Sequence, residues 1–208
     1  MENSEISMAV IKRLPRYFRY LEELMDSGIE RISSRDLSAR MGVTASQIRQ
    51  DLNNFGGFGQ QGYGYNVEHL RNEIARILGI DRIHTMIIVG AGNLGRAIAN
   101  YSNFAKRGFV VKGMFDENEE LVGSECRGAK VMPMSEMVSF IRENNIEILA
   151  LTIPKTSANE VARIAVEAGI RGIWNFAHMD LVVPENVVVE NVHLSESLMT
   201  LSYNLSEN

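Results

Sequence analysis

A glycine-rich turn at residues 90–95 is the part of the sequence best suited to hold a phosphorylated ligand. The turn reads Gly-Ala-Gly-Asn-Leu-Gly, follows the apolar run 85–89 and leads into an amphipathic stretch. In such a G-x-G-x-x-G pattern, the first glycine makes a tight turn, the second lets a pyrophosphate approach the backbone, and the third lets a helix pack on a strand. The N–H groups at the helix N-terminus favour phosphate. We therefore predict a dinucleotide site formed by Gly90, Ala91, Gly92, Asn93, Leu94 and Gly95.

A carboxylate in the next predicted strand makes this interpretation more specific. Asp116 ends the apolar run 110–116, at the place where a Rossmann fold holds the hydroxyls of the adenine ribose. The four residues that follow it include three glutamates and no Lys or Arg that would meet the extra phosphate of NADP. We predict NAD(H) as the cofactor. The alternative, that Asp116 only caps its loop, stays open.

Further alternation of strands and helices predicts an α/β fold with a doubly wound, mostly parallel sheet. Strands are expected at 147–154, 170–177 and 187–192, with a helix at 157–168. Ligands of such sheets bind beyond the carboxyl ends of the strands. Thr152, Ile153 and Pro154 are therefore candidates to line the nicotinamide or pyrophosphate side, although they can equally belong to the core.

The first part of the chain has the pattern of a helix-turn-helix. Residues 16–27 carry an apolar stripe that Gly28 ends, and Ser34 is the expected N-cap of a short second helix. Gly42 breaks that helix, and Thr44 caps a third helix whose apolar face is Ala45, Ile48 and Leu52. The third helix is expected to lie in a DNA major groove.

Polar side chains on the outer face of this third helix are able to read DNA. Arg49 and Gln50 are the preferred base readers, with Gln47 behind them, because Arg matches guanine and Gln matches adenine. Thr44 and Ser46, at the start of the helix, suit phosphate contacts. The alternative is that this face is only the solvated side of a packing helix.

Residues 55–66 alternate aromatic residues with glycines, which is typical of a β-hairpin. Directly after a helix-turn-helix, such a hairpin forms the wing of a winged helix and contacts the DNA backbone or minor groove. Gln60 and Gln61 are expected near its tip. A plain connector between domains is the alternative.

Composition limits the class of protein. The 208 residues carry a net charge of −5, with a basic excess only within residues 11–50, so indiscriminate coating of nucleic acid is not expected. One cysteine, Cys126, and the lack of Cys and His clusters predict neither a disulfide nor a metal site. The polar N-terminus lacks an export signal, and we expect a cytoplasmic protein without membrane segments.

Three parts of the chain are predicted. Residues 1–79 form the winged-helix DNA-binding domain, 80–192 the Rossmann domain, and 193–208 a C-terminal helix. That helix carries four leucines at helical spacing, which need a surface to cover. They cover either the chain's own sheet or, after exchange of the helix, a second subunit.

In this order, these motifs resemble those of Rex, the family of bacterial redox-sensing repressors. The resemblance rests on residues 13–19, 33–34, 42–52, 55–59, 62–65, 90–95, 174–176 and 201–203. It implies a homodimer with an exchanged C-terminal helix. It also implies operator binding when NAD+ dominates and release when NADH binds. Two-fold symmetry would then match an inverted-repeat operator.

The resemblance also implies residues that couple ligand to DNA. Tyr101 resembles the ligand-responsive tyrosine of the family. The family's Arg is at Arg19, but His193 stands where its acidic partner is expected, which is a departure from the pattern.

The rival interpretation is an NAD-dependent dehydrogenase, with Lys155, His178 or His193 as the acid or base. The chain leaves no room for a substrate domain, so we predict a protein that is not an enzyme. A CoA-binding or ligase-like fragment would share the Rossmann half without explaining the winged helix.

Overall fold

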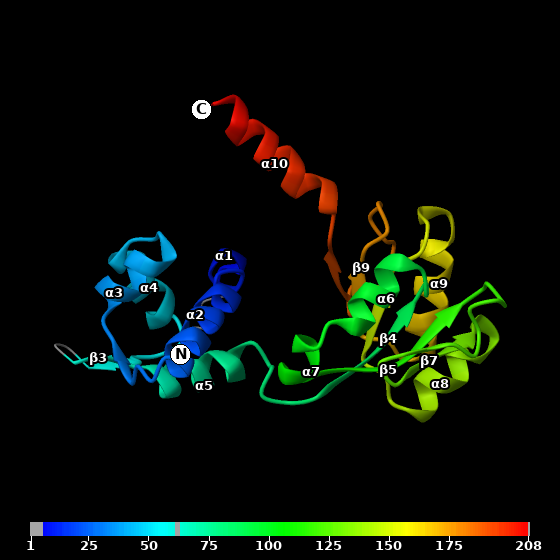
Figure 1. The fold of residues 1–208 in the computed structure, drawn as a ribbon, viewed down its shortest axis with the longest axis horizontal. Helices are drawn as coiled ribbons and strands as arrows, with labels where there is room; N and C mark the ends of the chain where they lie inside the picture. The colour runs from blue at the N-terminus through cyan, green and yellow to red at the C-terminus, as the bar shows by residue number, and fades with distance from the viewer. Residues whose placement is uncertain (1–5, 61–62, 208) are drawn as a thin grey trace. The chain divides into compact units, whose positions relative to one another are not determined.

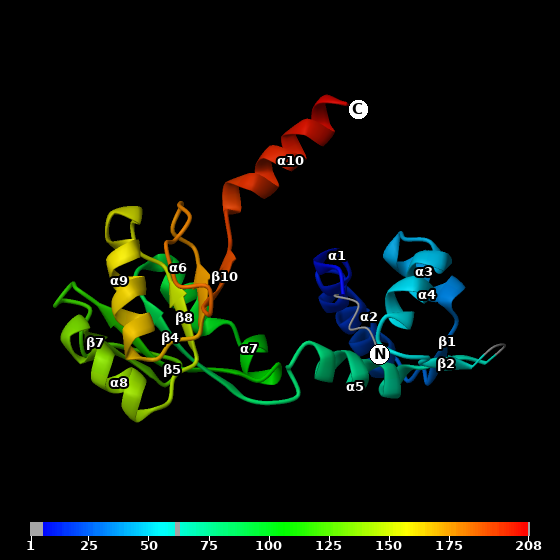
Figure 2. The same cartoon turned by 180° about the vertical axis from the view of Figure 1, so that it is seen from behind.

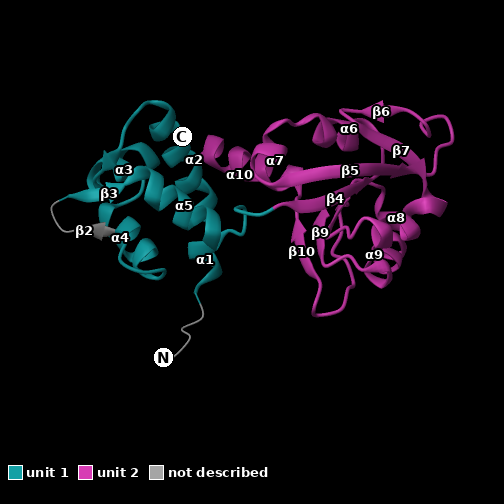
Figure 3. Ribbon diagram, turned by 90° about the horizontal axis from the view of Figure 1, so that it is seen from below, with its two compact units in different colours: residues 1–82 teal, residues 83–208 magenta. Residues whose placement is uncertain are grey.

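The computed structural model describes residues 6–60 and 63–207, and the chain divides into two compact units. Residues 1–82 form the first unit and residues 83–208 the second (Figure 3). The division lies three residues after the end of the first predicted domain. The predicted C-terminal part, 193–208, belongs to the second unit.

The first unit is a winged helix (Figure 1). Its elements are α1 (Met8–Ile11), α2 (Leu14–Asp26), β1 (Arg31–Ile32), α3 (Ser34–Met41), α4 (Ala45–Asn53), β2 (Gly59–Gln60), β3 (Gly64–Asn66) and α5 (Val67–Ile77). Pro15 lies in the first turn of α2, where its missing N–H does no harm. Apolar side chains of all the longer helices form one core, including the fully buried Tyr17, Leu37 and Ile48.

The turn between α3 and α4 follows its sequence signals closely. Gly42 has a φ of 64°, a left-handed conformation that suits glycine and ends α3. The Thr44 hydroxyl accepts a hydrogen bond from the N–H of Gln47, so the predicted N-cap of α4 is confirmed. The prediction for α3 was wrong by one residue. Ser33 is its N-cap and Ser34 is its first helical residue, because the Ser33 hydroxyl accepts the N–H of Asp36.

The predicted wing is present as a small antiparallel sheet in the order β1-β3-β2. Strand β2 pairs with β3 through Gly59 with Tyr65 and Gln60 with Gly64. Gly64 has a φ of 70°, and a Cβ there would lie 2.6 Å from the carbonyl oxygen of Ile32 on β1. Because glycine has no Cβ, β1 can lie close to β3 at this position.

The second unit is a doubly wound sheet, as predicted. Its strands are β4 (His84–Val89), β5 (Phe109–Asp116), β6 (Glu125–Cys126), β7 (Ala129–Pro133), β8 (Ile148–Leu151), β9 (Gly172–Asn175) and β10 (Val188–Asn191). Its helices are α6 (Asn93–Asn100), α7 (Asn103–Lys106), α8 (Met137–Glu143), α9 (Lys155–Ala168) and α10 (Leu194–Ser206), with a 3-10 turn at Met134–Glu136.

The strand order is β10-β9-β8-β4-β5-β7-β6, and every pairing is parallel except β6 with β7. Alternate residues of β4 face opposite layers. Ile87 and Val89 pack with residues of α8 and α9, while Met86 and Ile88 pack with residues of α6. Both faces near the centre of the sheet are thus covered, which explains why its central strands are continuous apolar runs.

The C-terminal helix α10 does not pack on the sheet of its own chain. It extends away from the other elements of its unit in Figures 1 and 2, and none of its residues is buried. Its large apolar side chains are 52–70% exposed, namely Leu194, Leu198, Met199, Leu201, Tyr203 and Leu205. Within the part of the chain that the structure describes, no helix has the length and apolarity needed to cross a bilayer.

Candidate functional site

The glycine-rich turn lies where the sheet changes its winding direction. Strand β4 has β5 on one side and β8 on the other, and all three run parallel. The loops that leave β4 and β8 therefore diverge at one edge of the sheet, which is where ligands of such folds bind. Residues 90–95 follow β4 and residues 152–154 follow β8, so both predicted segments meet at this edge.

The surroundings of the three glycines explain why glycine stands at each position, and they differ from one position to the next. Gly90 has a φ of 100°, and a Cβ there would lie 2.5 Å from the Thr152 carbonyl oxygen. A Cβ on Gly95 would lie 1.9 Å from the Gly90 carbonyl oxygen, which no side chain can tolerate. A Cβ on Gly92 would meet nothing within 4 Å, and Gly92 is the N-cap of α6 without a side-chain hydrogen bond. Open space at an uncapped helix N-terminus fits a pyrophosphate group.

Asp116 ends β5 beside this turn. Its Oδ2 accepts a hydrogen bond of 2.6 Å from the N–H of Ala91, and its Oδ1 accepts one of 2.8 Å from the N–H of Asn118. These bonds fix the carboxylate at the rim of the site, next to Glu117. The loop-capping role left open by the sequence is therefore real, and it does not exclude a second role toward a ribose.

A pocket of about 220 Å³ opens at this edge of the sheet. It is lined by six of the ten predicted cofactor residues, namely Gly90, Gly92, Asp116, Thr152, Ile153 and Pro154. Ala91 is buried and bonded to Asp116, Gly95 is buried under the turn, and Asn93 and Leu94 are exposed at the start of α6.

Sequence reasoning missed five other residues of this lining, namely Val89, Glu117, Met134, Ser157 and Val161. Glu117 was noticed only for its charge. Helix α9 begins directly after Pro154, and Ser157 lies in its first turn. This position at a helix start was the signal available. Met134 follows β7, which the sequence analysis did not predict.

The outer face of α4 presents most of the predicted DNA-contact residues. Ser46, Arg49 and Gln50 are exposed, and Thr44 is exposed at the N-cap. Arg49 Nη1 donates to the Ser34 hydroxyl at 3.0 Å, which links α4 to the start of α3. Of the two wing residues, Gln60 lies on β2 and Gln61 lies outside the described residues.

Gln47 is held by a buried carboxylate that the sequence analysis did not predict. Asp51, fully buried on α4, accepts two hydrogen bonds of 2.7 Å from Arg13, and one each of 2.8 Å from Tyr17 and Gln47. Burial alone would raise the pKa of Asp51, but the hydrogen bonds from its partners outweigh burial and lower that pKa. The carboxylate is therefore ionised near neutral pH, and it ties the recognition helix α4 to α2.

The three predicted coupling residues lie in both units. Arg19 is exposed on α2, with its guanidinium 5.2 Å from the ring centre of Tyr20. Tyr101 is half exposed at the C-cap of α6 and contacts Phe104 edge to face. His193 is the N-cap of α10, 5.2 Å from the ring of His178, and its buried Nδ1 has no hydrogen-bond partner among the described residues. The role of these residues in coupling stays a prediction.

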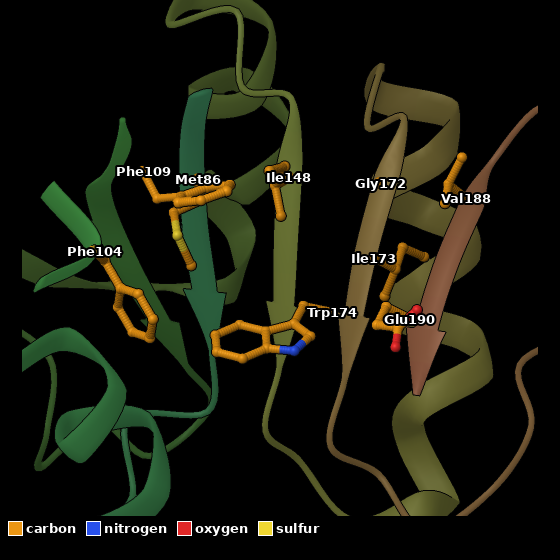
Figure 4. A pocket seen from close by; sticks show the side chains of 9 residues that line it. All are labelled: Met86, Phe104, Phe109, Ile148, Gly172, Ile173, Trp174, Val188 and Glu190. Carbon is orange, nitrogen blue, oxygen red and sulfur yellow. The ribbon is translucent and has the colours of Figure 1, made fainter. Parts of the chain in front are cut away.

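A second, apolar groove of about 300 Å³ lies away from the glycine turn. Figure 4 shows side chains from β4, β5, β8, β9, β10 and α7 around it. They are Met86, Phe104, Phe109, Ile148, Gly172, Ile173, Trp174, Val188 and Glu190. Because almost all of this lining is hydrocarbon, the groove suits an apolar surface and not a dinucleotide.

A winged helix joined to a Rossmann unit with a glycine-rich turn after β4 and a carboxylate at the end of β5 defines a class, the nucleotide-responsive transcription regulators. Two family models agree with the division. Residues 5–53 match the model described as "Putative DNA-binding protein N-terminus", and residues 81–179 match "CoA binding domain".

Relatives narrow the class to one family. The chain is 59% identical to the redox-sensing transcriptional repressor Rex of Thermoanaerobacter pseudethanolicus, over 99% of this chain and 92% of the relative. It is 58% identical to the Rex protein of Clostridioides difficile, over 99% and 98%. The chain belongs to the Rex family of redox-sensing transcriptional repressors. These relatives are repressors and not enzymes, so the dehydrogenase alternative is not favoured.

Solved structures of similar proteins agree with this assignment. RSP in complex with NAD+ and operator DNA matches with a TM-score of 0.93 at 59% identity, over 99% of this chain and 94% of that one. RSP in complex with NADH matches with a TM-score of 0.90 at 56% identity, over 99% and 96%.

Proposed function

We propose that this protein represses transcription by binding operator DNA through its winged helix, and leaves the operator when NADH replaces NAD+ in its Rossmann unit. The observation that carries the proposal is the open space at Gly92 beside the fixed carboxylate of Asp116. Relatives named as redox-sensing repressors, and RSP structures with each cofactor form, support it. The site of action is the cytoplasm, where the DNA and the cofactor pool of a bacterium are found.

In this proposal, different residues around the glycine-rich turn bind different parts of NAD(H). The N–H groups at the start of α6 hold the pyrophosphate, and Gly92 leaves it room. Asp116 accepts from the adenine ribose and, with Glu117, repels the phosphate of NADP. Thr152, Ile153 and Pro154 line the side of the pocket toward β8.

The residues of α4 and the wing divide the work of binding DNA. Arg49 and Gln50 contact base edges, and Thr44 and Ser46 contact phosphates, as the exposed face of α4 allows. Gln60 and Gln61 reach the backbone or minor groove from the wing.

The test is operator binding titrated against NADH at fixed NAD+ and fixed salt. Bound DNA should fall as NADH rises, and saturating operator should weaken NADH by the same factor, because coupling between two sites is reciprocal. NADH affinity that is indifferent to saturating operator would contradict the mechanism.

The second part of the proposal is a homodimer in which α10 is exchanged. Six large apolar side chains of α10 are exposed in the single chain, and an apolar groove on the sheet is available to cover such a face. Burial of this surface against a second subunit would fix the spacing of the two winged helices at about 34–36 Å, one turn of an inverted-repeat operator, or a multiple of it.

Deletion of residues 194–208 tests this dimer. The truncated protein should be monomeric by light scattering, and its affinity for a full operator should fall much further than its affinity for a half-site. A truncated protein that remains dimeric would contradict the exchange.

A further inference from the structure

The amide of Gln47 can take only one orientation. Its Nε2 donates to Asp51 Oδ1 at 2.8 Å, one helical turn further along α4. An ionised carboxylate only accepts hydrogen bonds, so the nitrogen of the amide must face Asp51 and the oxygen must face away. Rotating the amide by half a turn would place its oxygen against the carboxylate, and two acceptors would then repel.

The rest of the cluster keeps Asp51 ionised and in place. Arg13 binds both carboxylate oxygens with a two-pronged contact, and Tyr17 donates to Oδ2, while Gln47 uses Oδ1. Asp51 has no exposed surface, so water does not compete for its oxygens. A glutamine on an open helix face turns its amide to suit either kind of base edge, but Gln47 does not have this freedom.

We propose that Asp51 makes Gln47 an acceptor toward DNA, so that its Oε1 takes a hydrogen bond from an exocyclic amine, adenine N6 or cytosine N4, in the major groove. This inference rests on the proposed function, because it requires α4 to read DNA. A guanine facing the same oxygen would present two acceptors, O6 and N7, and would be disfavoured. Neither Arg49, which donates to the Ser34 hydroxyl, nor the exposed Gln50 is bonded to Asp51, so one helix combines a fixed acceptor with readers that Asp51 does not restrain.

The first experiment finds the base pair that depends on Gln47. The full-length protein and Gln47→Met, which keeps the length of the side chain but removes the amide, each select sequences from a random duplex library. The variant should lose preference at one position per half-site and keep the others.

The second experiment asks which atom of that base is read. Replacing adenine by purine, or cytosine by pyrimidin-2-one, removes only the exocyclic amine. This change should weaken wild-type binding roughly threefold to tenfold, as expected for one hydrogen bond, and should leave Gln47→Met unaffected. Replacing N7 by carbon at the same position should have a much smaller effect.

Tyr17→Phe is the matched control. It removes the donor to Oδ2 and leaves the bond between Gln47 and Oδ1, so the base preference at this position should not change. Selectivity of Gln47→Met equal to that of wild type, or wild-type binding that is sensitive to N7 and not to the amine, would overturn the inference. A wild-type protein that selects no sequence at all would instead refute the proposed function.

Discussion

Substitution of two glycines in the same turn separates folding from cofactor binding. Gly92 and Gly95 are three residues apart, but an added methyl group meets different surroundings at each. At Gly92 it meets nothing within 4 Å, and at Gly95 it meets the Gly90 carbonyl oxygen at 1.9 Å. Gly92→Ala should therefore affect the ligand alone, whereas Gly95→Ala should affect the fold.

The magnitudes follow from these distances. The backbone of Gly92 is extended, so alanine fits there, and stability should change by less than about 1 kcal/mol. The methyl group would occupy the approach of the pyrophosphate. Losing one hydrogen bond to a charged phosphate costs about 1.5–3 kcal/mol, which is roughly a tenfold to hundredfold loss of NADH affinity. The clash at Gly95 is with backbone and should destabilise the second unit by about 1–3 kcal/mol or more.

Thermal unfolding and a titration that follows NADH fluorescence measure both quantities on the same samples. Operator binding without cofactor should be retained by Gly92→Ala. If Gly92→Ala bound NADH as tightly as wild type, the placement of the pyrophosphate would be wrong. If Gly95→Ala were as stable as wild type, the argument from close packing would fail.

Three further predictions address single side chains. Arg49→Ala should weaken operator binding by about 1–3 kcal/mol in a salt-controlled titration and leave NADH affinity unchanged, because it removes a charged DNA contact on an exposed face. Asp116→Ala should weaken NADH and narrow its advantage over NADPH in competition titrations, because it removes both a ribose acceptor and a repulsive charge. The pKa of Asp51 is lowered in the fold, so ionised Asp51 should stabilise the folded protein. This contribution should be present above the ordinary pKa of about 3.9 and be lost as pH falls through the lowered value. Acid unfolding of wild type compared with Asp51→Asn would reveal it.

The parts of the fold that local sequence determines were predictable. In the Gly90–Gly95 turn, the first and last glycines answer to backbone constraints within a few residues or on the adjacent loop, and Gly92 leaves open space at the start of α6. Strand β4 is a continuous apolar run because both its faces are covered. The position of the α3 cap was ambiguous, because Ser33 and Ser34 are adjacent and either can cap a helix.

Features that depend on distant residues were not predictable. Asp51 lies one residue before Leu52 and faces the core, where a helical pattern alone suggests an exposed or flanking carboxylate. Its partner Arg13 is 38 residues away, so only the packing of α2 on α4 reveals the pair. Strand β7 was missed because it is short and mixes Lys130 and Pro133 with its apolar residues.

The glycine-rich turn at residues 90–95, joined to the loop after β8, has a consequence for the signal to which the protein responds. The Thr152 hydroxyl donates to the carbonyl oxygens of Val89 and Gly90, so the two loops are joined before any ligand arrives. In the proposed binding mode, the glycine-rich turn and Asp116 hold the pyrophosphate and the adenine ribose, which are identical in the oxidised and the reduced cofactor. NAD+ and NADH therefore compete for one binding site. When the total concentration of NAD+ and NADH exceeds both dissociation constants, every site is occupied. The fraction occupied by NADH then depends only on the NADH to NAD+ ratio and on the ratio of the two dissociation constants. Repression would then follow the redox balance of the cell and ignore growth or dilution of the pool.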